Sequence, residues 1–255
     1  MSERLNTPAE YVESAGSPEP SDSAASRRPV ALITGASRGI GLAIARRLAA
    51  DYDLILGASR EESLASVLPQ FPGARAFVAE LSDPTAIRAA VESLELERLD
   101  VLVHSAGVAD SQTLADGGWD AWLPVFQVNV FAVAELTHLL LPALRAAGGQ
   151  VVAINSGSGY RSGPGGGVYS ASKFALRALT DALREDERGQ VRVTSIHPGR
   201  VDTDMQVELQ RSMGNTDYDG SIYVAPESVA ETVALAVSMP AASMVEELSI
   251  RPVRQ

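Results

Sequence analysis

The chain has 255 residues, a net charge of −11 and 45% hydrophobic residues, which fits one large α/β domain or two small ones. The acidic balance argues against a nucleic-acid partner, because neutralising phosphates requires a basic surface. No cysteine is present, which excludes disulfides, thiolate catalysis and cysteine-ligated metals.

The first residues, 1 to about 28, are rich in Ser, Pro, Ala and Glu and have no apolar periodicity, so they are predicted to form a disordered tail. They have neither the basic start nor the apolar core of a secretory signal. No apolar run in the chain approaches the roughly 18 to 20 residues of a membrane span. We therefore expect a cytoplasmic protein with no membrane partner.

From Pro29 onward, apolar strand-like runs alternate with helical patterns. The expected strands cover residues 30–35, 53–59, 74–80, 99–107, 150–156, 191–197 and 246–251. The expected helices cover residues 39–50, 61–68, 84–94, roughly 119–146, 168–187 and 226–238. Continuous apolar strands separated by helices are typical of a mostly parallel sheet covered on both faces. The sequence thus predicts one α/β domain, residues 29–255, with a seven-stranded, doubly wound, Rossmann-like fold.

The turn between the first strand and the first helix, TGASRGIG, allows two interpretations. Its glycines can cradle the phosphates of a dinucleotide at a helix N-terminus. Residues 35–39 also satisfy G-x-S-x-G, the elbow that exposes a hydrolase serine. In that case Ser37 would be the nucleophile, and His197 with a later Asp would complete a triad. The local pattern by itself does not choose between them.

Lys173 is the only lysine among 21 basic residues. Tyr169 lies four residues before it, so the two side chains share one face of the predicted helix. A free tyrosine has a pKa near ~10 and is a poor acid–base catalyst at neutral pH. An adjacent ammonium stabilises the phenolate, so we expect Lys173 to lower the pKa of Tyr169.

Five elements, in order, resemble the motifs of the short-chain dehydrogenases/reductases. The turn from Thr34 to Gly41 is similar to T-G-x-x-x-G-x-G, and Tyr169 to Lys173 is similar to Y-x-x-x-K, with Ser156 at the family's usual separation before the tyrosine. The other elements are Ser105-Ala106-Gly107 in place of N-A-G, Val128-Asn129 within a helix, and Pro198-Gly199 followed by Thr203. The resemblance covers about residues 29 to 255.

This resemblance implies hydride transfer between NADP(H) and a carbonyl or secondary alcohol, such as an aldehyde, ketone or hydroxy acid. Ser156 would orient the substrate oxygen, Tyr169 would donate or accept the proton, Lys173 would hold the nicotinamide ribose, and Asn129 would hold a water. The implied cofactor-binding residues are Gly35, Ser37, Arg38, Gly39, Ile40, Gly41, Ser59, Arg60, Glu80, Leu81, Ser105, Ala106, Gly107, Tyr169, Lys173, Pro198, Gly199, Val201 and Thr203.

The choice of cofactor rests on the end of the second strand. NAD enzymes place a carboxylate there, bonded to the ribose 2′-hydroxyl. Here the position is Ser59, and Arg60 and Arg38 would attract a 2′-phosphate, which favours NADP(H). Glu80 and Leu81 stand where the family has Asp and an aliphatic residue near the adenine.

The other polar residues suggest no rival site. His104, His138 and His197 are interpreted as packing residues, and no metal-binding motif is present. Residues 204–224 are expected to form a substrate lid. The resemblance implies a homodimer or homotetramer packed through helices 119–146 and 168–187. Two alternatives remain: a non-catalytic NADP(H)-binding regulatory protein, and the hydrolase using Ser37.

Overall fold

The computed structural model describes residues 27–253 of the chain. Most of the predicted N-terminal tail lies outside these residues. Arg28, which the sequence analysis placed in the tail, belongs to the folded domain. Its guanidinium donates to the backbone carbonyls of Ala49 (2.7 Å) and Tyr52 (3.0 Å). These carbonyls follow the first helix, where the last turn leaves acceptors without helical partners.

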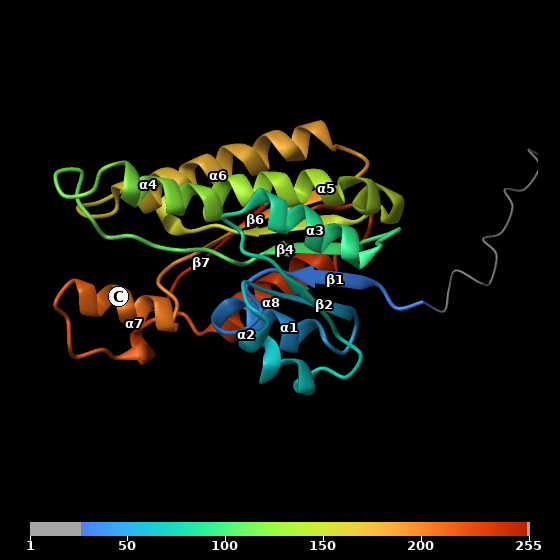
Figure 1. Ribbon diagram of the computed structural model, residues 1–255, viewed down its shortest axis with the longest axis horizontal. Coiled ribbons are helices and arrows are strands. Elements are labelled where there is room, and N and C mark those ends of the chain that lie inside the picture. The colour runs from blue at the N-terminus through green and yellow to red at the C-terminus, as the bar shows by residue number, and fades with distance from the viewer. Residues whose placement is uncertain (1–26, 254–255) are drawn as a thin grey trace, which may run out of the picture.

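A seven-stranded sheet lies at the centre of this part of the molecule, and each neighbouring pair of its strands is parallel (Figure 1). The strands are β1 (Val30–Ile33), β2 (Asp53–Ala58), β3 (Arg75–Val78), β4 (Val101–His104), β5 (Gln150–Ile154), β6 (Arg192–Pro198) and β7 (Glu247–Ile250). Their order is β3-β2-β1-β4-β5-β6-β7. The order reverses between β1 and β4, where such sheets open a ligand crevice. The doubly wound fold predicted from the sequence is confirmed.

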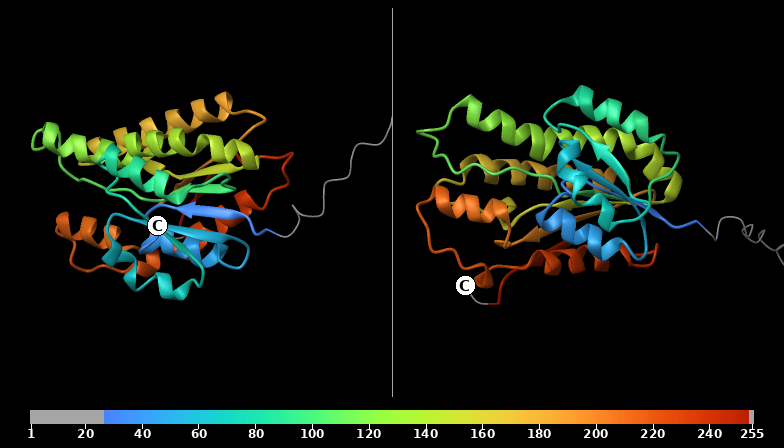
Figure 2. Two further views of the ribbon diagram at one scale, coloured as in Figure 1. Left: turned by 45° about the vertical axis from the view of Figure 1, so that its right-hand side comes forward. Right: turned by 60° about the horizontal axis from the view of Figure 1, so that its bottom comes forward.

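Helices form a layer on each side of the sheet (Figures 1 and 2). The α-helices are α1 (Gly39–Leu48), α2 (Glu61–Ala65), α3 (Pro84–Leu94), α4 (Trp119–Phe126), α5 (Ala132–Ala147), α6 (Gly167–Asp186), α7 (Asp204–Ser212) and α8 (Pro226–Val237). Short turns of other types are η1 (Leu68–Gln70), η2 (Gln127–Phe131), η3 (Gly157–Gly159) and η4 (Gly220–Ile222). Helices α1, α2 and α8 lie on one side, and α3 to α6 on the other (Figure 1).

Alternate residues of the strands contribute to two apolar cores, one on each face of the sheet. In β1, Ala31 and Ile33 pack with residues of α1 and α8, whereas Leu32 packs with residues of α3 and α5. All three side chains are completely buried. A strand buried on both faces needs apolar residues at every position, which explains the continuous apolar runs of the sequence.

The long helix predicted over residues 119–146 is not a continuous α-helix. It consists of α4, the π-helical turn η2 and α5, and Asn129 lies within η2. A π turn widens the backbone by one residue and is frequent at functional sites. The side chain of Asn129 is buried there, on the side that faces the loop after β4.

This same helical stretch, Trp119–Ala147, is long and apolar enough to cross a membrane by length and composition, with a mean hydropathy of 1.4. The sequence analysis considered only uninterrupted apolar runs, and polar residues such as Asn129 and Thr137 interrupt this one. By length and composition this helical stretch therefore qualifies as a candidate span, although it contains no uninterrupted apolar run of that length. A core helix meets the same criteria, and Leu136 and Leu140 of this stretch pack in the core beside the sheet.

Two predicted segments differ in detail from the elements that the structure shows. The helix expected over 61–68 ends at Ala65 and is followed by the 3₁₀ turn η1, which contains Pro69. The predicted lid, residues 204–224, contains helix α7 and the short turn η4. Thr203 caps α7, because its hydroxyl accepts the N–H of Gln206 at 3.4 Å. In Figure 1, α7 lies at the end of the molecule where the strands have their carboxyl ends.

Candidate functional site

The turn between β1 and α1 brings backbone rather than side chains to the crevice. Gly35 has a φ of +65°, and a Cβ there would lie 2.8 Å from the Cα of Ala106. A Cβ on Gly41 would lie 2.2 Å from the carbonyl oxygen of Gly35, so both positions require glycine. No side chain caps the N-terminus of α1. Its free N–H groups therefore provide a binding site for an anion such as a phosphate.

Thr34 fixes the opposite wall of the crevice. Its Oγ1 accepts the backbone N–H groups of Ser105 (3.0 Å) and Ala106 (3.1 Å). These bonds turn the chain out of the sheet, so β4 ends at His104 rather than at the predicted residue 107. The sequence analysis quoted Thr34 only as part of the turn motif and missed this role. A small hydroxyl residue at the end of a buried strand was the available signal.

A cavity of about 340 Å³ lies over this turn. The predicted cofactor residues that line it are Gly35, Ser37, Arg38, Gly39, Ile40, Gly41, Ser59, Glu80, Leu81, Ser105, Ala106, Gly107 and Thr203. Arg60 does not line it. Its side chain is exposed, and Arg60 is the N-cap residue that precedes α2. The expected contact of Arg60 with a 2′-phosphate stays a prediction.

Charged groups surround the outer end of this cavity. Arg38 is exposed, and its Nη1 lies 3.6 Å from Oδ2 of Asp204, the first residue of α7. Glu80 is held locally, because its Oε1 accepts the N–H (3.1 Å) and the hydroxyl (3.0 Å) of Ser82. Ser59 adds no charge. Arg38 is thus the cation at this end of the cavity.

The cavity fits a nicotinamide dinucleotide. The Oγ of Ser105 is buried and has no hydrogen-bond partner within residues 27–253, so a hydroxyl or amide of a ligand would satisfy it. The absence of side chains at Gly35 and Gly41 lets neighbouring backbone segments approach each other closely, and the uncapped N-terminus of α1 would hold the phosphates. The residues present therefore match the cofactor inferred from the sequence.

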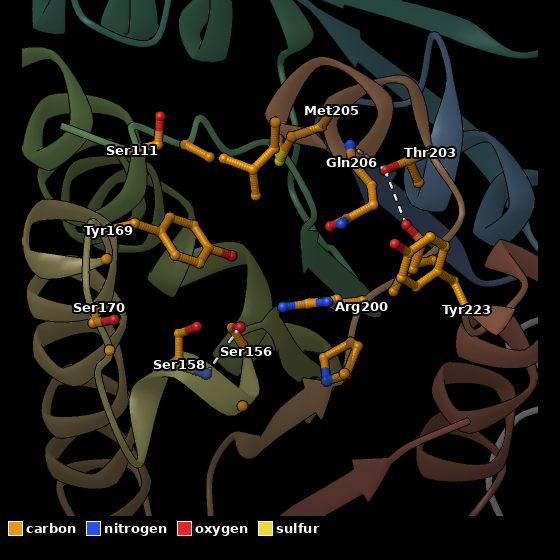
Figure 3. A pocket seen from close by; sticks show the side chains of 18 of the residues that line it. Ser111, Ser156, Ser158, Tyr169, Ser170, Arg200, Thr203, Met205, Gln206 and Tyr223 are labelled. Atoms are coloured by element: carbon orange, nitrogen blue, oxygen red, sulfur yellow. Dashed lines mark hydrogen bonds between the residues drawn. The ribbon is translucent and has the colours of Figure 1, made fainter. Parts of the chain in front are cut away.

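A second cavity, of about 670 Å³, adjoins the first (Figure 3). Ile40, Thr203 and Met205 line both cavities, so they mark the junction. Ser156 and Tyr169 face Met205 of the lid helix across the second cavity (Figure 3). The other predicted residues that line it are Pro198, Gly199 and Val201.

Ser156 is held on three sides. Its N–H donates to Oδ1 of Asn155 at 2.9 Å, and its hydroxyl oxygen accepts the N–H of Ser158 at 3.0 Å. Its carbonyl oxygen lies 3.1 Å from Nδ1 of His197, a completely buried ring. The hydroxyl proton remains able to donate to an oxygen in the cavity. The sequence analysis treated His197 as packing and missed this contact with the serine loop.

Tyr169 and Lys173 lie one turn apart on α6. Lys173 is 5% exposed, and its Nζ lies 5.7 Å from the centre of the Tyr169 ring. The ammonium donates to the carbonyl of Ile154 at 3.0 Å. Burial lowers the pKa of Lys173 to about 8. These two residues therefore share a face, as the spacing predicts.

The effect on the phenol differs from the expectation. Burial raises the pKa of Tyr169, and hydrogen bonding to the Ser156 side chain opposes this shift. The net shift is upward, so the Lys173 ammonium, which donates to the Ile154 carbonyl, does not bring the pKa of Tyr169 below its ordinary value. Tyr169 is thus a neutral phenol, suited to donate a proton rather than to accept one.

Asn129 connects the loop after β4 to α6. Its Oδ1 accepts the N–H of Val108, and its Nδ2 donates to the carbonyl of Val108, both at 2.9 Å. Nδ2 also donates to Oγ of Ser172 at 3.0 Å, and this hydroxyl donates to the carbonyl of Tyr169 at 2.7 Å. Asn129 therefore positions the loop and α6 together. The water-binding role implied by the resemblance stays a prediction.

The hydrolase alternative requires His197 beside Ser37. Instead, the ring nitrogens of His197 lie near the Ser156 carbonyl and, at 3.8 Å, near Glu247, while Ser37 lines the first cavity. The triad does not assemble. His104 is buried against Thr137 at 2.9 Å, and burial lowers its pKa to about 3. Within residues 27–253, no group of three or more His, Asp or Glu side chains could hold a metal ion.

Comparison with known proteins agrees with this geometry. The family model described as short chain dehydrogenase matches residues 29–214. The chain belongs to the short-chain dehydrogenase/reductase family. An uncharacterized oxidoreductase of Staphylococcus saprophyticus is 33% identical over 234 residues, which cover 88% of this chain and 97% of that protein. Members of this family bind a nicotinamide cofactor, so the chain is an NAD(P)-dependent oxidoreductase.

Two solved structures are close in shape. An alcohol dehydrogenase from the archaeon Thermococcus sibiricus, complexed with 5-hydroxy-NADP, has a TM-score of 0.81 and 30% identity, covering 90% of this chain and 98% of that one. The closed form of a serine dehydrogenase complexed with NADP+ has a TM-score of 0.82 and 27% identity, covering 89% of this chain and 96% of that one. The fold and the cavity over the glycine turn are therefore those of this oxidoreductase family.

Proposed function

We propose that this protein is an NADP(H)-dependent carbonyl reductase or alcohol dehydrogenase that acts on CH–OH groups. The observation that carries the proposal is the placement of the Ser156 and Tyr169 side chains on the wall of the second cavity, across from Met205 at its junction with the cofactor cavity. A carbonyl oxygen between these two hydroxyls would accept hydrogen bonds from both.

We assign each residue of the site a role in the proposed reaction. Ser156, held by Asn155, Ser158 and His197, orients the substrate oxygen. Tyr169 donates a proton to that oxygen during reduction, and the phenolate that forms is stabilised by the positive charge of Lys173. When bound, the reduced nicotinamide supplies the hydride that the carbonyl carbon receives.

The preference for NADP(H) rests on the outer end of the cofactor cavity. Ser59 places no carboxylate there, and Arg38 supplies a guanidinium for a 2′-phosphate. The ion pair of Arg38 with Asp204 is exposed, so a doubly charged phosphate would compete for it effectively. The NADP forms bound in the two related structures support the same preference.

We also propose a homo-oligomer that packs through the layer formed by α4, α5 and α6. Phe131 on η2 and Phe174 on α6 are 55% and 43% exposed, which is unusual for large aromatic side chains. Burying them against a second copy would remove this apolar surface from water.

For the cofactor, we expect tighter binding of NADPH than of NADH in calorimetric titrations. Arg38→Gln should weaken NADPH binding about tenfold, because an exposed charge-assisted contact is lost. Ser59→Asp should shift the preference toward NADH, because the new carboxylate repels the 2′-phosphate. Arg60→Gln is the matched control and should have a smaller effect than Arg38→Gln. Tighter binding of NADH to the unmodified protein would contradict the proposal.

For catalysis, Tyr169→Phe should reduce carbonyl turnover by roughly 10²-fold or more, because the ring packing stays while the transferable proton is lost. NADPH binding, followed by calorimetry, should persist in this variant. Ser37→Ala should reduce carbonyl turnover by less than about tenfold, since it removes at most one cofactor contact.

The reverse result, loss of catalysis in Ser37→Ala with Tyr169→Phe unaffected, would restore the hydrolase interpretation. NADPH binding without turnover of any aldehyde, ketone or alcohol would instead favour the non-catalytic regulatory protein.

The pH dependence of reduction should reflect Lys173. Its pKa is lowered to about 8, so the side chain is charged below pH 8 and neutral above it. The pKa of Tyr169 is raised, so the phenol keeps its proton throughout this range. At saturating NADPH we therefore expect turnover to be flat at neutral pH and to fall as the pH rises through about 8. A rate that stays constant up to pH 9.5 would contradict this assignment.

For assembly, sedimentation velocity should give a dimer or tetramer. The double variant Phe131→Glu/Phe174→Glu should sediment as a smaller species, because two charges cannot be buried in the interface without partners. Leu235→Glu is a matched control on α8, with a side chain that is 52% exposed on the opposite layer, and it should leave the assembly unchanged. A monomeric unmodified protein would refute the proposal.

A further inference from the structure

The wall of the second cavity carries an excess of positive charge. Its charged lining residues are Arg161, Arg200 and Arg251 against the single carboxylate of Asp110. The chain as a whole has a net charge of −11. A basic cavity in an acidic protein would attract an anion specifically to this position. The sequence analysis did not assign any of these arginines a role.

The three arginines differ in what their guanidinium groups already contact. Arg251 donates to the backbone carbonyls of His197 and Ile250, so it is part of the cavity wall. Arg161 and Arg200 form no ion pair within residues 27–253. Asp110 forms no ion pair with them, and its two oxygens accept the N–H (2.7 Å) and the amide (3.2 Å) of Gln112.

The backbone of Arg200 is fixed by hydrogen bonding, whereas its side chain forms no ion pair within residues 27–253. Its carbonyl accepts the N–H of Val224 at 2.9 Å, and Val201 beside it pairs with Val224 as an isolated parallel bridge. Figure 3 shows the Arg200 side chain extending from this loop into the cavity, on the same side as Ser156. The guanidinium thus lies beside the space that a substrate at Ser156 and Tyr169 would occupy.

We propose that the substrate carries a carboxylate, which Arg200 binds while the reacting carbonyl or hydroxyl lies at Ser156 and Tyr169. A planar carboxylate can accept two parallel N–H bonds from a guanidinium, which fixes the orientation of the molecule as well as its position. The preferred substrates are then short oxo or hydroxy acids. This inference rests on the proposed reductase function, because it places the reacting group at Tyr169.

The test compares oxo acids of three to six carbons with their methyl esters, which keep the chain and remove the charge. With NADPH, kcat/KM should favour the acid over its ester by about tenfold or more for the best chain length. Arg200→Gln should reduce this acid-to-ester ratio by about tenfold or more. Arg211→Gln is the matched control, because Arg211 lies on α7 but does not line the cavity, and it should keep the ratio. Thermal melting of both variants checks that they fold.

A second measurement does not depend on turnover. Succinate, titrated calorimetrically, should bind the unmodified protein and bind Arg200→Gln about tenfold more weakly. Turnover of acids and esters alike, with a ratio that Arg200→Gln does not change, would overturn the inference while the reductase function stands. Succinate binding that depends on Arg200, without oxidation of NADPH by any compound, would support the anion site and refute the reductase function.

Discussion

The hydroxyl of Thr34 accepts two backbone N–H groups from the loop after β4, and the arrangement of the site depends on this junction. It brings the loop against Gly35 and so forms the floor of the cofactor cavity. The same loop is held from its other end by Asn129, whose amide also bonds Ser172 of α6. Ser172 in turn bonds the backbone of Tyr169. Hydrogen bonds and the short loop segment between them therefore connect the floor of this cavity to Tyr169, the proposed proton donor.

Burial sets the protonation of the two central groups. Lys173 donates to the backbone carbonyl of Ile154, and its removal from water lowers its pKa to about 8. The same burial raises the pKa of Tyr169 and keeps the phenol neutral. An acid that must donate at neutral pH needs its proton, and a charge that stabilises the resulting phenolate must lie close to it. The Tyr169–Lys173 pair on α6 fits both requirements of the proposed reaction.

The fold and much of the site could be predicted from residues that act locally. Glycine at 35 and 41 is required by the close approach of backbone, and Tyr169 and Lys173 share a helical face because they are four residues apart. The two apolar cores follow from strands with apolar residues at every position. Ser59 lines the cavity whereas its neighbour Arg60 does not, because Arg60 is the N-cap residue at which the chain enters α2.

The sequence by itself determined the alternation of strands and helices, the glycine turn and the Tyr169–Lys173 pair, because steric demands and periodicity act between near neighbours in the chain. Only the tertiary structure decided the partners of Thr34, the π turn at Asn129, the direction of the Lys173 ammonium and the position of Arg200 in the second cavity. Each of these depends on segments far apart in the sequence that meet across the sheet. The pKa values depend in addition on burial, which arises only when the chain is packed.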